Sequence, residues 1–207
     1  AKQEKIMPIV TLPNGELRDE VRQPLYDTVV LAAAATVVGI RRFFQTNMST
    51  GNIPKSLAQT NMEQPGSLPT ATSFRVQGLC VDSDNDSIVS NNELLLAMFA
   101  RSSSVSLQVG TKNYWQSPLR FACGRMQAAY ATTAGEYVSQ QYGWAAVQPV
   151  VFQGRHVIDI NPLQNFIINW ETNANDLTAA EAAYTVGAAT QLVFVASLKG
   201  LLRRPVQ

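Results

Sequence analysis

The amino-acid sequence predicts an all-β protein in the form of a sandwich, a jelly roll or a related barrel. About eight or nine short runs of alternating or β-branched residues occur along the chain, and turn-forming residues separate them. Only two brief helical patterns interrupt these runs. No internal repeat and no linker divides the 207 residues, so we expect a single domain, 1–207.

The N-terminal part is expected to be an arm, residues 1 to about 25. Within it, residues 6–12 predict a short edge strand, because the proline at position 8 is tolerated only at an edge or a strand start. A Pro-Asn-Gly turn signal follows at 13–15. The Val- and Ala-rich run over 28–44 predicts one or two strands, although a helix competes there, because β-branched residues favour extended backbone.

A long loop is predicted over 45–72, which is polar and carries three prolines and two glycines. Loops of this length are uncommon inside a compact domain and usually functional when they are ordered. In a protein that builds an assembly, such a loop would make contacts between subunits. The alternative is an excursion from the surface without such a role.

The middle of the chain predicts a strand, an acidic loop and a helix in that order. Residues 74–81 alternate well enough for a strand, and 82–87 form the acidic loop. Residues 91–100 predict a short helix, because Asn can cap its start and an early Glu suits the helix dipole. One face of the strand is expected to carry Phe74, Val76 and Cys80.

The second half of the chain predicts further strands. Residues 105–109 alternate cleanly, and a turn leads into another run that ends at Pro118. Residues 124–146 are rich in Ala, Gln, Tyr and Gly and show little periodicity, so we expect a loop with a possible helix there. Residues 150–160 resemble a hairpin turned at Gln153-Gly154-Arg155.

Two more strands and a helical turn complete the prediction. The strand over 164–170 is expected to face inward through Phe166, Ile168 and Trp170. A helical turn is expected over 177–183, introduced by Asp176 or Thr178. The final strand covers 190–202, and its inward residues are expected to be Leu192, Phe194, Ala196 and Leu198.

The charge of the chain is low for a globular protein. Charged residues make up 15% of the sequence, where about 25% is typical, and neutral polar residues replace them. Such a composition fits a surface that neighbouring subunits cover. The net charge of +1 is not concentrated in any run of Lys or Arg, which disfavours direct binding of nucleic acid. The pairs Arg41-Arg42 and Arg203-Arg204 are interpreted as flanking solubility charges.

Neither a leader nor a membrane helix is expected. The N-terminal residues run into a segment broken by proline, without the apolar core of a signal peptide. The longest apolar stretch, 29–40, has 12 residues, whereas a spanning helix needs about 20. Cys80 and Cys123 lie far apart and do not indicate a disulfide framework.

A calcium loop is the strongest metal motif in the sequence. Four carboxylates occupy positions one, three, five and twelve of such a loop, namely Asp82, Asp84, Asp86 and Glu93. Position six is Ser87, where the loop requires glycine, and the segment before the loop has a strand pattern rather than a helical one. We therefore favour an ordinary Asp- and Asn-rich turn over a metal site.

No enzyme active site is predicted. His156 is the only histidine and lies in a strand-like run, and structural zinc would need four Cys or His ligands. Neither a dinucleotide-binding nor a Walker-type glycine loop occurs. A group of aromatic residues could line a sugar-binding groove or pack a core or interface: Tyr114, Trp115, Tyr130, Tyr137, Tyr142 and Trp144.

Several stretches resemble the single jelly-roll capsid proteins of tailless, icosahedral, membrane-containing phages. The likeness covers about 74 to the C-terminus, and more loosely 43–68, through the stretches 74–79, 107–119, 163–166 and 198–207. The resemblance implies an eight-stranded jelly roll that self-assembles into an icosahedral shell of the virion, built in the host cytoplasm. It implies partners among copies of the chain, other shell proteins and an internal viral membrane, with no catalytic residue, cofactor, small-molecule substrate or direct contact with nucleic acid.

Two other functions stay open on the residues alone. One is a carbohydrate- or receptor-binding β-sandwich, such as a spike or lectin-like module, that uses the exposed tyrosines and calcium at the acidic loop. The other is a glycan-processing enzyme, which requires two acidic residues facing one cleft. A capsid subunit would form large assemblies, whereas a binding module would remain a monomer or small oligomer.

Overall fold

The computed structural model describes most of the chain. The described residues are 9–11, 15–32, 34–45, 55–83, 98–122, 126–131, 137–142, 150–152, 154, 157–183, 185–186 and 192–206. They are mainly strands, and the helical parts among them are short. No described helix is long and apolar enough to cross a membrane.

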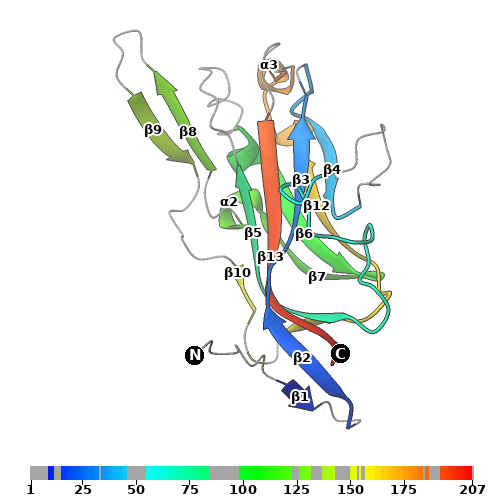
Figure 1. Cartoon of the computed structure of the whole chain (residues 1–207). Helices are drawn as coiled ribbons and strands as arrows, with labels where there is room; N and C mark the ends of the chain where they lie inside the picture. The colour runs from blue at the N-terminus through cyan, green and yellow to red at the C-terminus, as the bar shows by residue number, and fades with distance from the viewer. Residues whose placement is uncertain are drawn as a thin grey trace.

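Two antiparallel sheets pack face to face, which confirms the predicted all-β sandwich (Figure 1). In the first sheet β13 lies between β5 on one side and the successive strands β2 and β3 on the other. β1 adds to β2, while β10 and β11 add to the far edge of β5. Its strands are β1 (Ile9–Thr11), β2 (Leu17–Arg22), β3 (Leu25–Leu31), β5 (Ser73–Ser83), β10 (Val150–Val151), β11 (Ile158–Ile160) and β13 (Leu192–Pro205).

The second sheet has the order β4-β12-β6-β7, and a separate hairpin joins β8 to β9. These strands are β4 (Gly39–Phe43), β6 (Ser103–Val109), β7 (Lys112–Pro118), β8 (Met126–Ala131), β9 (Tyr137–Tyr142) and β12 (Phe166–Thr172). Residues 98–102 are helical, which places the end of the helix predicted over 91–100. The remaining short helices are α2 (Leu119–Ala122), η2 (Ala174–Asp176) and α3 (Ala179–Ala182).

The core lies between the two sheets and is rich in aromatic rings. Trp170 of β12 contacts Phe194 of β13 across the sandwich, with ring centroids 4.4 Å apart. Phe99 packs its edge against both rings, at 4.9 Å from Trp170 and 5.5 Å from Phe194. The inward faces predicted for the strands over 164–170 and 190–202 are confirmed, because their named residues are all buried.

A β-bulge corrects the face predicted for β5. Val76 pairs with Gly200 and Gly78 pairs with Lys199, so the register skips Gln77. The side chains beyond the bulge therefore change faces: Leu79 and Val81 join Phe74 and Val76 in the core. Cys80 lies on the opposite face, and the prediction that it shares a face with Phe74 is wrong. Its thiol donates a hydrogen bond to Asp82, with Sγ 3.3 Å from Oδ2.

Two further predictions are wrong. The segment over 124–146, expected as a loop with a possible helix, contains the β8–β9 hairpin, in which Met126 pairs with Tyr142. The helix propensity of its Ala and Gln residues is outweighed by cross-strand pairing. The segments over 150–160 do not form a hairpin with each other, because β10 and β11 both pair with β5. Eleven residues of β5 leave enough edge for two successive partners.

The start of α3 shows why the helical turn was predictable. Thr178 is the N-cap, and its hydroxyl accepts a hydrogen bond from the amide of Glu181. The Glu181 carboxylate accepts one in return from the Thr178 amide at 2.9 Å. This capping box satisfies amide groups that the short helix leaves without partners. Of the two predicted starts, Asp176 belongs to the preceding η2 and Thr178 caps the helix.

Candidate assembly surface

The long loop protects one edge of the first sheet. Its residues 55–61 run along the open side of β3, where Thr60 forms an antiparallel bridge with Asp27. The Asn61 side chain accepts a hydrogen bond from the Tyr26 amide at 2.9 Å and donates one to the Pro24 carbonyl at 2.7 Å. An uncovered edge of this kind would invite pairing with another chain. This part of the loop therefore covers its own sheet, and contacts of the 45–72 loop with other subunits stay a prediction.

A buried ion pair fastens this loop. Asp27 of β3 points toward the core side and is only 2% exposed. Its carboxylate accepts a hydrogen bond from the Lys55 ammonium group at 2.7 Å and another from the Phe44 amide at 2.7 Å. Lys55 also donates to the Thr28 carbonyl at 2.7 Å. The lysine thus connects the loop to β3 at residues that pair with Ala196 and Val195 of β13.

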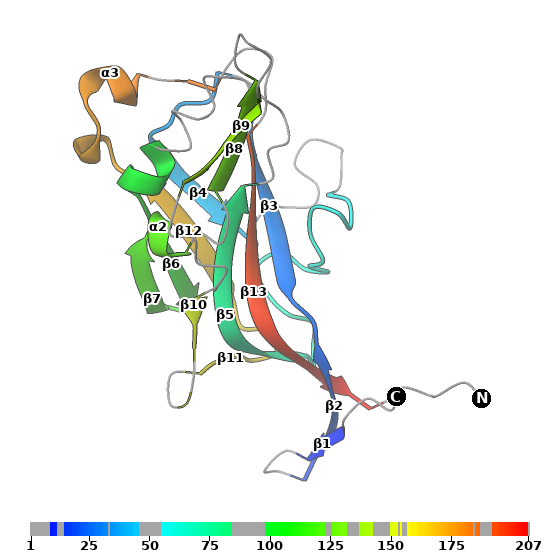
Figure 2. The same cartoon turned by 90° about the vertical axis from the view of Figure 1, so that its left-hand side faces the viewer.

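The first sheet extends beyond the second at one end of the molecule. Figures 1 and 2 show β1, β2 and the C-terminal end of β13 reaching past β6, β7 and β12. We call this part the overhang, and define it as β1, β2 and residues 201–206. The register Leu202↔Val21 and Asp19↔Ile9 holds its three strands together. Both the N-terminal and the C-terminal ends of the described chain lie in or beside the overhang.

The two faces of the overhang differ in chemistry. The outer face carries ion pairs: Arg203 Nε lies 2.7 Å from a Glu20 oxygen, and Arg18 Nη2 lies 2.6 Å from Glu16. The inner face continues the core face of the sheet and extends past the strands of the second sheet (Figure 2). By the register of β1 and β2, it carries the apolar side chains of Ile9, Leu17 and Val21 together with Asp19. Ile9 and Leu17 are 55% and 53% exposed, and Val206, just after β13, is 41% exposed. An apolar face beside an open strand edge is typical of an interface.

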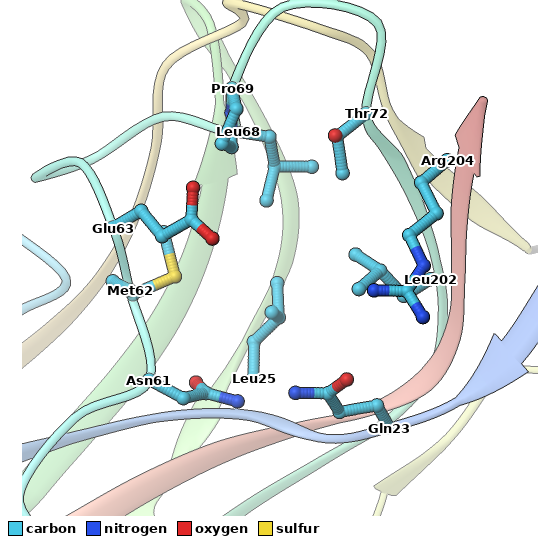
Figure 3. A pocket seen from close by; sticks show the side chains of 10 residues that line it. All are labelled: Gln23, Leu25, Asn61, Met62, Glu63, Leu68, Pro69, Thr72, Leu202 and Arg204. Atoms are coloured by element: carbon cyan, nitrogen blue, oxygen red, sulfur yellow. The ribbon is translucent and has the colours of Figure 1, made fainter. Parts of the chain in front are cut away.

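A hollow lies on the same inner face, at the base of the overhang (Figure 3). Its volume is about 190 Å³. Figure 3 shows Leu25, Leu68 and Leu202 forming the inner wall, with Glu63 and Arg204 on opposite sides of the opening. The other lining residues are Gln23, Asn61, Met62, Pro69 and Thr72. We call this hollow the socket. Its floor is apolar and its rim is polar, as are the core and the rim of a protein–protein interface.

A second, polar cleft of about 480 Å³ lies beside the ends of β6, β7 and β12. Glu171 and Asp176 both line it, so the sandwich does bring two acidic residues to one cleft. The other lining residues are Arg101, Ser102, Ser103, Ser104, Gln116, Ser117, Pro118 and Asn173. This lining has no aromatic ring on which a sugar could stack. The hydroxyl groups of Ser102 and Ser103 are already bonded, to the Met98 carbonyl and to Thr172.

The predicted metal and catalytic candidates are placed only in part. Asp82 lies in β5 and not in a loop, while Asp84, Asp86 and Glu93 lie outside the described residues, as does His156. In the described part of the chain, no group of three or more His, Cys, Asp or Glu side chains could hold a metal ion.

The aromatic candidates divide in the same way. Trp115 packs against the core, and Tyr114 is 42% exposed with the Lys112 ammonium 4.9 Å from its ring centre. Tyr130, Tyr137 and Tyr142 lie in the β8–β9 hairpin, and Trp144 lies outside the described residues. Trp115 therefore packs the core, which is one of the two interpretations of these rings, and a sugar-binding groove formed by the others stays a prediction.

The two dibasic pairs are not simply solubility charges, and that interpretation is wrong for one member of each. The Arg41 guanidinium stacks 4.9 Å from the Trp170 ring and 5.3 Å from the Phe99 ring. Burial lowers the pKa of Arg41 to about 10. Arg203 is tied to Glu20 in the overhang. Both cations therefore hold the structure together and are not available for phosphate.

The sequence did not predict the overhang or the socket. Arg18, Glu20 and Arg22 occupy every second position and place Leu17 and Val21 on the opposite face, which is a strand pattern interrupted only by Asp19. This alternation could have identified β2, but no local signal indicates that a sheet face lacks its opposite layer.

No protein-family model matches this chain, and no curated protein matches it either.

Proposed function

We propose that this chain is a capsid subunit, built on a single jelly roll, that assembles with copies of itself into an icosahedral shell. Jelly rolls with two four-stranded sheets occur in viral shell proteins and in lectins. The order of the strands supports this assignment of the sandwich. Successive strands alternate between the sheets at almost every step, from β3 to β4, β5 and β6, and later from β7 to β11, β12 and β13.

The same order places the first and last main strands side by side. β3 and β13 pair in one sheet, while β4 and β12 pair in the other. A long antiparallel hairpin that folds over into two sheets produces this pattern, because its early strands pair with its late strands in both sheets. The β8–β9 hairpin then lies between β7 and β10 as an insertion.

The overhang is the observation that carries the proposed function. A three-stranded sheet with ion pairs on one face and exposed apolar side chains such as Leu17 and Ile9 on the other is poorly suited to a solitary monomer, because exposed apolar patches beside open edges favour association. The charged fraction of 15% points the same way. Shell subunits are tiled, so each surface that is exposed in one copy can be covered by the next.

Light scattering of the purified chain over a concentration series, with and without calcium, tests this proposal. A capsid subunit is expected to form capsomers or shells whose mean mass rises with concentration. A strict monomer at the highest concentration, in both buffers, would contradict it. Dependence of the mass on calcium would identify the acidic segment that begins at Asp82 as part of the contacts.

The polar cleft favours one alternative, a carbohydrate-binding sandwich. Its serine, amide and carboxylate groups are the kinds of partner that sugar hydroxyls use. A glycan array would detect such binding. A monomer that binds glycans, and that loses binding on Glu171→Gln, would replace the capsid proposal.

A further inference from the structure

We infer that two copies of the chain pair through their overhangs about a two-fold axis, with Leu17 of each copy inserted into the socket of the other. This inference rests on the proposed function and names the contact through which the overhang acts. The exposed leucine and the empty hollow lie on one face of one sheet, so the same surface carries both halves of the contact.

The register fixes the spacing of the two features. Val21 pairs directly with Leu202, which lines the socket. Leu17 lies four residues further along β2, on the same face because side chains alternate, and therefore about 13 Å from Val21. Two overhangs can face each other with their β2 strands running in opposite directions. A two-fold axis midway between Val21 and Leu17 then places each Leu17 over the partner's socket. Contacts of this kind are isologous: each copy supplies the same knob and the same hole.

The size of the socket suits an aliphatic side chain. Its volume of about 190 Å³ exceeds the roughly 150 Å³ of an apolar cavity that can take up benzene. The apolar floor of Leu25, Leu68 and Leu202 would contact the leucine, and the polar residues would remain at the rim. Ile9, on the same face as Leu17 through its pairing with Asp19, would extend the apolar contact beside it.

Charge also favours a second copy over an unrelated partner. The opening of the socket carries one acidic and one basic residue, Glu63 and Arg204, on opposite sides (Figure 3). The strand face next to it adds a second acid, because Asp19 lies directly opposite Arg204. A surface that carries both signs can pair Arg204 of one copy with an acidic residue of the other, whereas a partner of one strong charge would face charges of both signs.

Leu17→Glu, compared with Leu57→Glu, tests the contact by analytical ultracentrifugation of the full chain. Both leucines are exposed, by 53% and 76%, so neither change should disturb folding, which circular dichroism would verify. We expect Leu17→Glu to raise the dissociation constant of the pair by about 100-fold or more, because two buried leucines are lost at once. Leu57→Glu should associate like the wild type, and Leu17→Met should retain most of the affinity.

Three outcomes are distinguishable. Loss of association in Leu17→Glu alone supports the inference. If the wild type associates and both Glu variants associate equally well, the inference is overturned while the proposed function is left intact. A wild type that never associates overturns both.

Cysteine cross-linking provides a second, positional test. Leu17→Cys combined with Glu63→Cys should form disulfide-linked dimers under mild oxidation, whereas either single variant and the wild type should not. A double variant that stays monomeric on a non-reducing gel, under conditions in which the wild type associates, would contradict the inferred geometry.

Discussion

Removal of Lys55 is expected to destabilise the protein more than a single change at any other ion pair among the described residues, because its partner Asp27 is the least exposed of them. Its ammonium group lies 2.7 Å from the Asp27 carboxylate, and the two side chains are 18% and 3% exposed. Lys55→Met would leave Asp27 charged and buried, with the Phe44 amide still donating to it. Breaking a buried pair in this way costs about 3–5 kcal/mol, and the partial exposure of the lysine places the expected loss near the lower end, about 3 kcal/mol.

Urea denaturation measures this loss, and a double variant isolates its cause. In Asp27→Asn/Lys55→Met the neutral amide needs no cation and can still accept from Phe44, so stability should return to within about 1 kcal/mol of the wild type. Lys112→Met is the matched control, since its ammonium lies over Tyr114 at the surface, and should cost less than about 1 kcal/mol.

Amide exchange adds a local readout of the same substitution. The Tyr26 amide donates to Asn61 of the loop, so it should exchange faster when Lys55→Met loosens the loop from β3. If the stability of Lys55→Met lies within about 0.5 kcal/mol of the wild type and the exchange of the Tyr26 amide is unchanged, the Asp27–Lys55 pair does not fasten the loop.

Two further predictions concern the bulge and the cap of α3. Gly200→Ala should lower the free energy of unfolding, measured by urea denaturation, by about 1–3 kcal/mol, because its Cβ would lie 2.0 Å from the Arg75 carbonyl oxygen. Gly154→Ala is the control: a Cβ there meets nothing within 4 Å, so only the positive φ opposes it, at a cost of about 1 kcal/mol. The pKa of Glu181 is lowered by hydrogen bonds from the Thr178 amide and from Arg101, so NMR titration should give a midpoint below the ordinary value of about 4.3. The helix cap should therefore be fully stabilising above that pH and weaken as the pH falls through the lowered pKa. Thr178→Ala removes the hydroxyl that donates to the Glu181 carboxylate at 3.0 Å, so it should move the midpoint upward, and an unmoved midpoint would contradict the capping role.

The sequence predicted the sandwich because its central strands carry strict alternation. In β6, β12 and the first part of β13 every second side chain is buried in the core, so buried and exposed residue types alternate along the sequence itself. The capping box of α3 is equally local, since Thr178 and Glu181 are only three residues apart. Such features depend on neighbours in the chain and can be predicted from it.

The features that were not predicted depend on distant partners. The bulge that turns Cys80 away from the core is set by the close approach of Gly200 to the Arg75 carbonyl, 125 residues away in the sequence. Likewise, β10 and β11 pair with β5 because β5 offers a free edge, which no pattern within 150–160 records. The apolar face of the overhang is visible only once the extent of both sheets is known.

Electron microscopy of the concentrated, purified chain would show directly whether copies assemble into a shell, because it gives the geometry of any assembly and not only its mass. We expect closed icosahedral shells, or capsomers in which neighbouring copies meet at their overhangs. Fields that contain only separate particles of the size of one 22.6 kDa chain, at concentrations where the protein remains folded, would contradict it.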